Sequence, residues 1–273
     1  MPELPEVETT RRALLPHAAG QRIAAVTVRT PRLRQPIDAR LPEILRDHTL
    51  RDIERRAKYL LFRFAHGTLI VHLGMSGSLR LVPAAQAAVA HEHIDLQLAS
   101  GQTLRLRDPR RFGLVLWHAG ALDEATHPLF AHLGVEPLTA QFNAAYLRER
   151  ACGRRTAIKP FLMDQQNVVG VGNIYASESL CRARIHPNTA AGRIRPARLA
   201  ALVDAVQATL RDAIAAGGST LRDFVSGEGR PGYFQQSYAV YGRTGLPCPR
   251  CATPIRHTQH ARRSTYYCPH CQR

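Results

Sequence analysis

The chain lacks the features that would place it in a membrane or outside the cell. No stretch of its 273 residues approaches the run of about 18 apolar residues that a membrane-spanning helix needs. Its first residues are acidic, whereas an export signal begins with basic residues. No low-complexity block interrupts the sequence, and 45% of its residues are hydrophobic, as in globular proteins. We therefore expect a soluble, cytoplasmic protein, long enough for two domains.

Acidic residues and lysines are both scarce. The sequence has 37 lysines and arginines against 21 acidic residues, which gives a net charge of +16 and a pI of about 10.6. Lys58 and Lys159 are its only lysines. A bias in genome composition explains the preference for arginine over lysine, but it does not explain the excess of bases over acids. The positive field favours a polyanionic partner, and we interpret that partner as nucleic acid.

Cysteines are few, and most of them lie near the C-terminus. Four of the six form two close pairs, Cys248 with Cys251 and Cys268 with Cys271. Two C-x2-C pairs separated by a short hairpin predict a zinc ion held by four thiolates. Such a site has no open position for water, so the zinc is structural and supplies folding energy to a small module. Cys152 and Cys181 stand alone, and no disulfide framework is expected.

Hydrophobic patterning predicts a β-rich first half. A short helix is expected at residues 9–19. Short strands are expected at residues 22–30, 50–56, 59–64, 68–73, 79–82, 94–99, 103–107 and 113–117. Many short strands separated by turns favour an antiparallel sandwich or barrel over a parallel sheet. Residues 83–93 are predicted to form a polar loop that contains His91 and His93.

The second half is predicted to be helical. Phe142, Tyr146 and Leu147 share a helical face, and a short helix is expected at residues 158–164. Apolar residues recur every three or four positions from Leu199 to Ile214, which predicts a long amphipathic helix that ends at a glycine pair. The linker between the halves is placed at residues 128–137.

The first residues after the initiator carry the first chemical hypothesis. If Met1 is removed, Pro2 becomes a secondary amine, and an α-amine titrates at about 7.7–8.0, against about 10.4 for lysine. An unprotonated amine attacks an electrophilic carbon and forms an iminium adduct. Glu3 is placed to move the protons that this attack requires. The alternative is an inert, disordered terminus.

Further candidate residues lie at glycine-rich turns. Asn173 follows two glycines at a predicted helix start, where backbone N–H groups suit a phosphate; Lys159, Arg154 and Arg155 upstream support this interpretation. Met75 and Phe112 lie beside turns, where protruding apolar groups wedge a base stack, although taken alone each is a typical core residue. By itself, His72 is typical of an internal histidine, and Lys58 of a phosphate-contacting surface residue. The basic hairpin at 257–265 is either a solvated turn or a groove-binding element.

Taken together, the motifs resemble those of one family from end to end. They are PELPEVE at 2–8, RRAKYLL at 55–61, HLGMSGSLR at 72–80, DPRRFG at 108–113, KPFLMD from 159, VVGVGNIYASESL up to 180, GGSTLRDF at 217–224, PGYF at 231–234 and the four-cysteine finger. The sequence resembles bacterial formamidopyrimidine-DNA glycosylases (Fpg, or MutM) of the Fpg/Nei family.

The resemblance implies an α+β multidomain fold and a DNA repair activity. The expected parts are an N-terminal β-sandwich catalytic domain at 1–130, a helix-two-turn-helix domain at 138–235 and a zinc finger at 239–273. The implied enzyme is a bacterial, nucleoid-associated monomer that removes oxidised purines, such as 8-oxoguanine and formamidopyrimidines, from double-stranded DNA. It then cleaves the abasic site by β,δ-elimination, with one structural Zn2+.

The resemblance also implies residue roles. Pro2 attacks the sugar, Glu3 is the acid/base, Lys58 assists the first elimination and Arg263 the second. DNA contacts are assigned to His72, His91, Arg110, Arg154 and Asn173, and void filling to Met75, Arg110 and Phe112. Arg154 stands where a lysine is common, which keeps the charge but changes its geometry. A loop at 217–241 is expected to cover the extruded base.

Two alternatives stay open at this point. The endonuclease VIII branch of the same family acts on oxidised pyrimidines, although Leu4, Val7 and Glu8 resemble the purine branch. A non-catalytic DNA-binding zinc protein fits the charge and the finger equally well, and Pro2 would then be inert.

Overall fold

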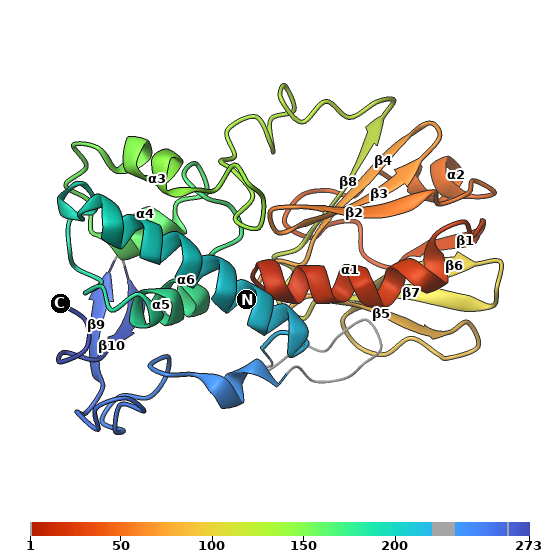
Figure 1. The fold of residues 1–273 in the computed structure, drawn as a ribbon. Helices are drawn as coiled ribbons and strands as arrows, with labels where there is room; N and C mark the ends of the chain where they lie inside the picture. The colour runs from red at the N-terminus through yellow and green to blue at the C-terminus, as the bar shows by residue number, and fades with distance from the viewer. Residues whose placement is uncertain (1, 220–232, 261) are drawn as a thin grey trace. The chain divides into compact units, whose positions relative to one another are not determined.

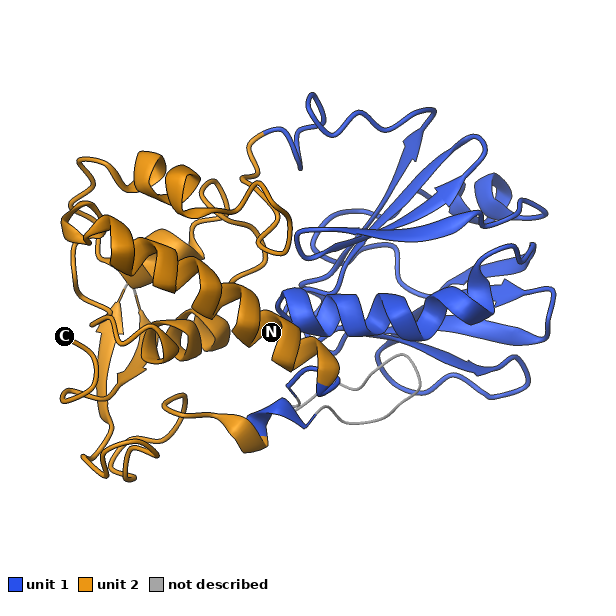
Figure 2. Cartoon of the chain, in the orientation of Figure 1, with its two compact units in different colours: residues 1–131, 216–235 blue, residues 132–215, 236–273 orange. Residues whose placement is uncertain are grey.

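The computed structural model of the chain describes residues 2–219, 233–260 and 262–273. The chain forms two compact units, shown in separate colours in Figure 2. Unit 1 comprises residues 1–131 and 216–235, and unit 2 comprises residues 132–215 and 236–273. Each unit is therefore assembled from two separate stretches of the sequence.

Two antiparallel sheets of four strands build unit 1 (Figure 1). One sheet has the order β1-β6-β7-β5, with β1 at Ile23–Val28, β5 at Ser78–Pro83, β6 at Glu92–Leu98 and β7 at Gln102–Arg107. The other has the order β2-β3-β4-β8, with β2 at Asp52–Arg56, β3 at Tyr59–Phe64, β4 at Gly67–His72 and β8 at Leu114–Ala119. Every strand predicted from the sequence overlaps one of these.

The two sheets share one apolar core, which confirms the predicted sandwich. Fully buried Phe62 of β3 and Leu104 of β7 belong to the same cluster, as does Leu14 of the first helix. The antiparallel registers keep such residues aligned, since Leu60 pairs with Val71, and Val71 in turn pairs with Val115. Because side chains alternate along each strand, every second residue contributes to this core.

The first helix, α1, spans Leu4–Ala18 and not residues 9–19 as expected. Pro5 lies in its first turn, where its missing N–H costs no hydrogen bond. The backbone N–H of Glu3 donates to a carboxylate oxygen of Glu6 at 2.7 Å, as in a capping box. The Pro/Glu motif is thus a helix start. A one-turn helix, α2 (Leu41–Leu45), was not predicted, because five residues show no period.

The described part of unit 2 combines three short helices and one long helix with a hairpin. Its helices are α3 (Ala144–Ala151), α4 (Ile158–Met163), α5 (Asn173–Arg182) and α6 (Pro196–Ala215), with 3-10 turns η1 (Ala191–Arg193) and, at the junction of the units, η2 (Phe234–Ser237). The hairpin pairs β9 (Arg256–His260) with β10 (Arg263–Tyr267). The apolar face predicted from Leu199 to Ile214 is buried along α6. Among the described residues, none of these helices has the length and hydropathy required to cross a membrane.

Candidate active site and nucleic-acid interface

The start of α1 is fixed by a buried carboxylate that the sequence did not single out. Pro2 is buried, Glu3 is 2% exposed, and Glu3 is the N-cap residue of the helix. Besides Glu3, Glu6 accepts a hydrogen bond from the backbone N–H of Ser219 at 2.8 Å. One buried side chain therefore ties the beginning of the chain to a turn 213 residues away.

The turn that Glu6 holds has little room for a side chain. Gly218 has a φ of +80°, and a Cβ there would lie 3.1 Å from the Glu6 carboxylate. Beyond it, Ser219 bridges Tyr233, and the N–H of Phe234 donates to the Gly218 carbonyl at 3.0 Å. The expected cover at 217–241 includes residues 220–232, which lie outside the described residues, so the structure describes only its two ends.

Lys58 occupies a tight turn between β2 and β3. It is 6% exposed, and the preceding Ala57 has a φ of +54°. Arg55 donates to the Ala57 carbonyl at 3.0 Å and to Glu8 of α1 at 3.1 Å. The peptide that leads into Lys58 is therefore linked through Arg55 and Glu8 to helix α1, which begins beside Pro2 and Glu3. Lys58 is buried, so the interpretation of it as a surface residue is wrong.

His72 is held as a neutral imidazole. Burial, with the nearby charges of Arg34 and Lys58, lowers the pKa of His72 to about 4. Its Nδ1 accepts the backbone N–H of Gly74 at 2.9 Å, so the proton of the neutral ring is on Nε2. At neutral pH His72 offers a neutral N–H donor and no positive charge.

Asp108 fastens the two glycine-rich loops to each other. Its carboxylate is fully buried and accepts the hydroxyl of Ser76 at 2.9 Å and the N–H of Gly113 at 2.7 Å. A Cβ on Gly74, whose φ is +66°, would lie 2.4 Å from the Phe112 backbone. The loops therefore touch backbone to backbone, which explains the glycines in both motifs.

The same two loops present their apolar side chains to the solvent. Met75 is 42% exposed and Phe112 is 45% exposed, which makes them two of the few large apolar residues that the described parts of the chain expose. The Arg110 guanidinium lies 4.8 Å from the centre of the Phe112 ring, in a cation–π contact. We call the two loops joined by Asp108, residues 73–77 and 108–113, the Asp108 clamp. Because solvent exposure of large apolar groups is unfavourable, their placement on this clamp is typical of a binding surface.

The two histidines of the predicted loop differ in environment. His91 is exposed, and its φ is +70°; its carbonyl accepts the Asp108 N–H at 2.9 Å. His93 belongs to β6 instead of the loop, is 5% exposed, and contacts the Asp108 carbonyl through Nε2 at 2.9 Å. His91 thus stays a candidate contact, whereas His93 supports the clamp.

In unit 2, the expected helix start at Asn173 is confirmed, but the role inferred for Lys159 is wrong. Lys159 is 1% exposed, so it offers no charge at the surface. Its ammonium donates to the Asn173 side chain at 2.7 Å, the Ser264 carbonyl at 2.7 Å and the Thr265 hydroxyl at 2.8 Å. Three acceptors around one ammonium suit lysine. Through these bonds Lys159, on α4, joins the start of α5 to the hairpin.

Arg154 follows α3 and keeps an exposed side chain on a fixed backbone. Its N–H donates to the Ala151 carbonyl, and its own carbonyl accepts the N–H of Gly192, both at 3.0 Å. A Cβ on Gly192 would come within 2.9 Å of the Arg154 backbone. Arg155 beside it is exposed as well, so this corner of unit 2 carries two cations.

The four paired cysteines come together. Their Sγ atoms all lie within 4.8 Å of one another, with Cys251 3.5 Å from Cys268 and 3.4 Å from Cys271, and Cys248 4.0 Å from Cys271. Zinc–sulfur bonds of about 2.3 Å in a tetrahedron place sulfurs about 3.8 Å apart, so the cluster fits zinc. Cys181 lies in the same apolar cluster, and burial raises the pKa of this fifth thiol to about 12.

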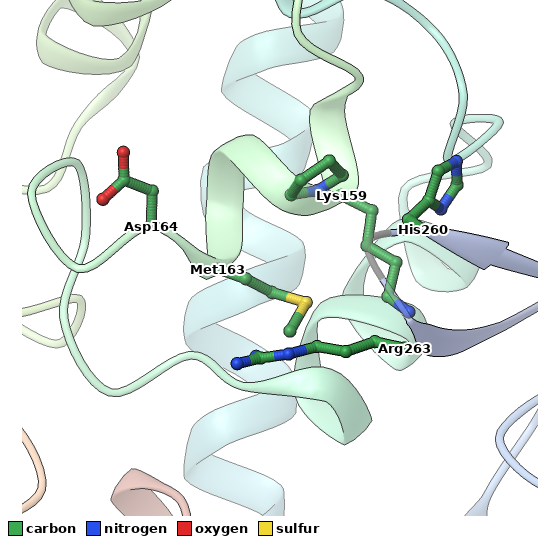
Figure 3. A pocket seen from close by; sticks show the side chains of 6 residues that line it. Lys159, Met163, Asp164, His260 and Arg263 are labelled. Atoms are coloured by element: carbon green, nitrogen blue, oxygen red, sulfur yellow. The ribbon is translucent and has the colours of Figure 1, made fainter.

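Arg263 begins β10, opposite His260. Both residues line a pocket of about 280 Å³ together with Lys159, Met163 and Asp164 of the α4 region. Figure 3 shows the extended Arg263 side chain beside the Met163 thioether. The predicted hairpin is therefore confirmed as part of the finger, and its Arg263 lies beside residues of α4.

Buried carboxylates are what the sequence reasoning missed. In addition to Glu6, Glu8 and Asp108, Glu178 of α5 accepts the backbone N–H groups of Ala239, Val240 and Tyr241 at 2.8–3.0 Å. Nothing near them in the sequence marks these carboxylates as buried, since Asp108 lies among arginines and Glu6 and Glu8 lie in a polar segment. Asp108 fixes the two loops that carry Met75 and Phe112, and Glu178 fixes the segment that leads into the finger.

Comparisons with known proteins agree with this organisation. Residues 1–115 match the formamidopyrimidine-DNA glycosylase N-terminal domain, residues 133–225 the H2TH domain of the same glycosylase, and residues 245–273 the zinc finger found in FPG and IleRS. With the cysteine cluster, the last match confirms the predicted structural zinc site.

Similar sequences and structures extend over the whole chain. The formamidopyrimidine-DNA glycosylase of Aromatoleum aromaticum is 60% identical over all of both chains, and that of Edwardsiella ictaluri is 52% identical with the same coverage. A Lactococcus lactis FPG mutant bound to Fapy-dG-containing DNA has a TM-score of 0.91 at 34% identity over all of both chains. MutM (FPG) from Thermus thermophilus has a TM-score of 0.86 at 38% identity, covering 99% of this chain and 98% of that one.

Proposed function

The chain belongs to the formamidopyrimidine-DNA glycosylase family of DNA repair enzymes, and from this premise we propose that it excises oxidised purines from duplex DNA and then cleaves the abasic strand. The arrangement that carries the proposal is in unit 1. Helix α1 begins at the Pro2–Glu3 pair and is bonded through Glu8 and Arg55 to the turn that holds Lys58.

The first step joins the protein to the sugar. The lone pair of the Pro2 nitrogen forms a bond to C1′ of the damaged nucleotide. The base leaves with the electrons of the glycosidic bond and takes up a proton. Glu3 takes the proton that the Pro2 nitrogen loses and passes it to O4′ as the C1′–O4′ bond opens, and an iminium remains at C1′.

Two eliminations follow from this iminium. Loss of the acidified C2′ proton breaks the C3′–O bond and releases the phosphate on the 3′ side, and we assign the assistance at this step to Lys58. A second elimination releases the phosphate at C5′, which we assign to Arg263. The polarity of α1 supports the amine chemistry, because the positive end of a helix dipole disfavours a protonated amine beside it.

The target base has to leave the stack before Pro2 reaches its sugar. Extrusion costs a few kcal/mol, and less where damage weakens the pair. We assign the filling of the vacated space to Met75, Phe112 and Arg110, since the Asp108 clamp holds the first two exposed.

Contacts to the DNA backbone are assigned to residues of both units. They are His72, His91, Arg110, Arg154 and Asn173. The net charge of +16 favours double-stranded DNA as the partner and predicts affinity that falls steeply with salt. We propose that one copy of the chain acts alone, with the zinc ion holding the hairpin that carries Arg263.

Borohydride trapping on a duplex that contains 8-oxoguanine tests the proposal. The processed protein is expected to form a reduced covalent adduct whose sugar maps to Pro2 by mass spectrometry. Pro2→Gly lacks the secondary amine and should trap far less, and protein that retains Met1 should be inactive. An adduct on another residue, or none, would refute the nucleophile; stronger trapping on an oxidised pyrimidine would favour the endonuclease VIII alternative.

A further inference from the structure

We propose that Arg55 is a positioning residue that sets the location of Lys58 relative to the start of α1. The inference rests on the proposed function, because it concerns the elimination step assigned to Lys58. Arg55 itself is not expected to touch the DNA, since its side chain is only 12% exposed.

The contacts of Arg55 run in two directions. Its Nε donates to Glu8 Oε2 at 3.1 Å, and its Nη1 donates to the Ala57 carbonyl at 3.0 Å. Glu8 is on α1, between the Glu3 cap and the body of the helix. The Ala57 carbonyl belongs to the peptide bond that leads directly into Lys58. Arg55 therefore joins the helix with Pro2 and Glu3 to the peptide that carries the second reactive amine.

The turn needs this support because its backbone is strained. Ala57 has a φ of +54°, in the left-handed region that residues with a Cβ disfavour. Such a conformation persists where surrounding contacts fix it, and the Arg55 hydrogen bond is one contact at that residue. Lys58 is 6% exposed, so its side chain is confined by its neighbours and its position depends on the backbone of this turn.

The anchor at the other end is a permanent anion. Burial alone would raise the pKa of Glu8, but hydrogen bonds from Arg11 and Arg12 and the charges of Arg11 and Arg55 lower it to about 2. Only a guanidinium offers fixed, divergent N–H groups for a carboxylate and a carbonyl at once. A lysine at position 55 would keep the charge but would lose one of the two contacts.

Arg12 provides a matched control. It also donates to Glu8, at 2.8 Å, but its side chain is 61% exposed and the structure gives it no bond to the Lys58 turn. Arg55→Met and Arg12→Met thus each remove one cation from the same carboxylate. Of these two ion pairs, the one made by Arg55 is the one that continues to Ala57.

The first measurement compares the elimination rate with the yield of covalent adduct, both on a duplex with an abasic site. Borohydride trapping reports the covalent adduct, and single-turnover strand cleavage reports elimination. We expect Arg55→Met to keep the trapping yield while its elimination rate falls about tenfold to a hundredfold, because small misplacements of a reacting group cost that much. Arg12→Met should keep the wild-type ratio, and Arg55→Lys should fall in between.

The second measurement needs no activity. The chain has only two lysines, so protein labelled with 13C at the lysine ε carbon gives two resonances. Arg55→Met should move the Lys58 resonance and leave that of Lys159 in place, while Arg12→Met should move neither. Where Arg55→Met does not fold, Arg55→Lys takes its place in both experiments.

The outcomes separate the inference from the proposed function. If wild-type protein gives no adduct, the proposed function fails, and the Lys58 resonance still decides whether Arg55 positions it. If wild-type protein traps and cleaves while Arg55→Met matches Arg12→Met in both the ratio and the resonance, Arg55 is not a positioning residue.

Discussion

Replacing Glu8 by glutamine is expected to destabilise unit 1 in a manner that depends on pH. Glu8 is 7% exposed and receives hydrogen bonds from Arg11, Arg12 and Arg55. These cations overcome the effect of burial and lower its pKa from 4.5 to about 2. A carboxyl whose pKa is lowered on folding stabilises the folded state above its unfolded pKa, and this contribution disappears as the pH falls through the folded pKa.

The magnitude follows from the shift. A displacement of about 2.5 pKa units corresponds to about 3 kcal/mol at pH 7. The contribution of Arg12 is screened by solvent, since its side chain is 61% exposed. We therefore expect Glu8→Gln to lower the free energy of unfolding at pH 7 by about 2 kcal/mol. At pH 2.5 the difference in unfolding free energy between wild type and Glu8→Gln should be about 1 kcal/mol or less.

The assay uses the single tryptophan of the chain. Trp117 belongs to β8 and packs against the core of unit 1, so its fluorescence during urea unfolding reports this unit and not the zinc finger. Wild type and Glu8→Gln are compared from pH 7 down to pH 2.5. Glu43→Gln, on an exposed position of α2, serves as the control and should behave like wild type.

Two results would refute the reasoning. Equal unfolding free energies at pH 7 would mean that the buried ion pairs add nothing beyond the neutral amide. A difference that stays constant down to pH 2.5 would mean that the effect comes from packing and not from the charge.

Three further outcomes are expected. Cys268→Ser should lose its zinc and bind duplex DNA at least tenfold more weakly, because four thiolates hold the metal; unchanged affinity in zinc-free protein would contradict this. Met75→Ala and Phe112→Ala should each slow excision from duplex about tenfold while shifting the melting temperature little, since both side chains are more than 40% exposed; a large loss of stability would instead make them core residues. Because the pKa of His72 is lowered to about 4, wild type should lose stability as the pH falls from about 6.5 towards 4, where only the unfolded chain takes up the proton; His72→Gln should lose less over that range, as urea titrations at several pH values would reveal.

Features that depend on near neighbours in the sequence were predictable. The strands of the sandwich, the apolar face of α6 and the helix start at Asn173 follow from periodicity and from glycine. The zinc ligands follow from two C-x2-C pairs. The start of α1 was missed, since proline and glutamate are typical of loops as well as of first helical turns.

Features that depend on distant partners were not predictable. Lys159 was interpreted as support for a phosphate site at Asn173, yet it is buried against residues 105 and 106 positions away. The roles of Glu6, Asp108 and Glu178 have the same origin, because a carboxylate gives no local sign of the backbone N–H groups that it will accept. Sequence reasoning proposed which residues carry the chemistry, and it missed the buried carboxylates that fix the turns around them.

The sequence alone determined the basic charge, the metal-binding module and the two classes of secondary structure, because composition, spacing and periodicity act over a few residues. Only the tertiary structure decided that Glu6 joins the chain start to the Gly218 turn and that Arg55 joins α1 to the Lys58 turn. The physical reason is that a buried charge is stable only beside partners that neutralise it, and folding, not sequence proximity, selects those partners.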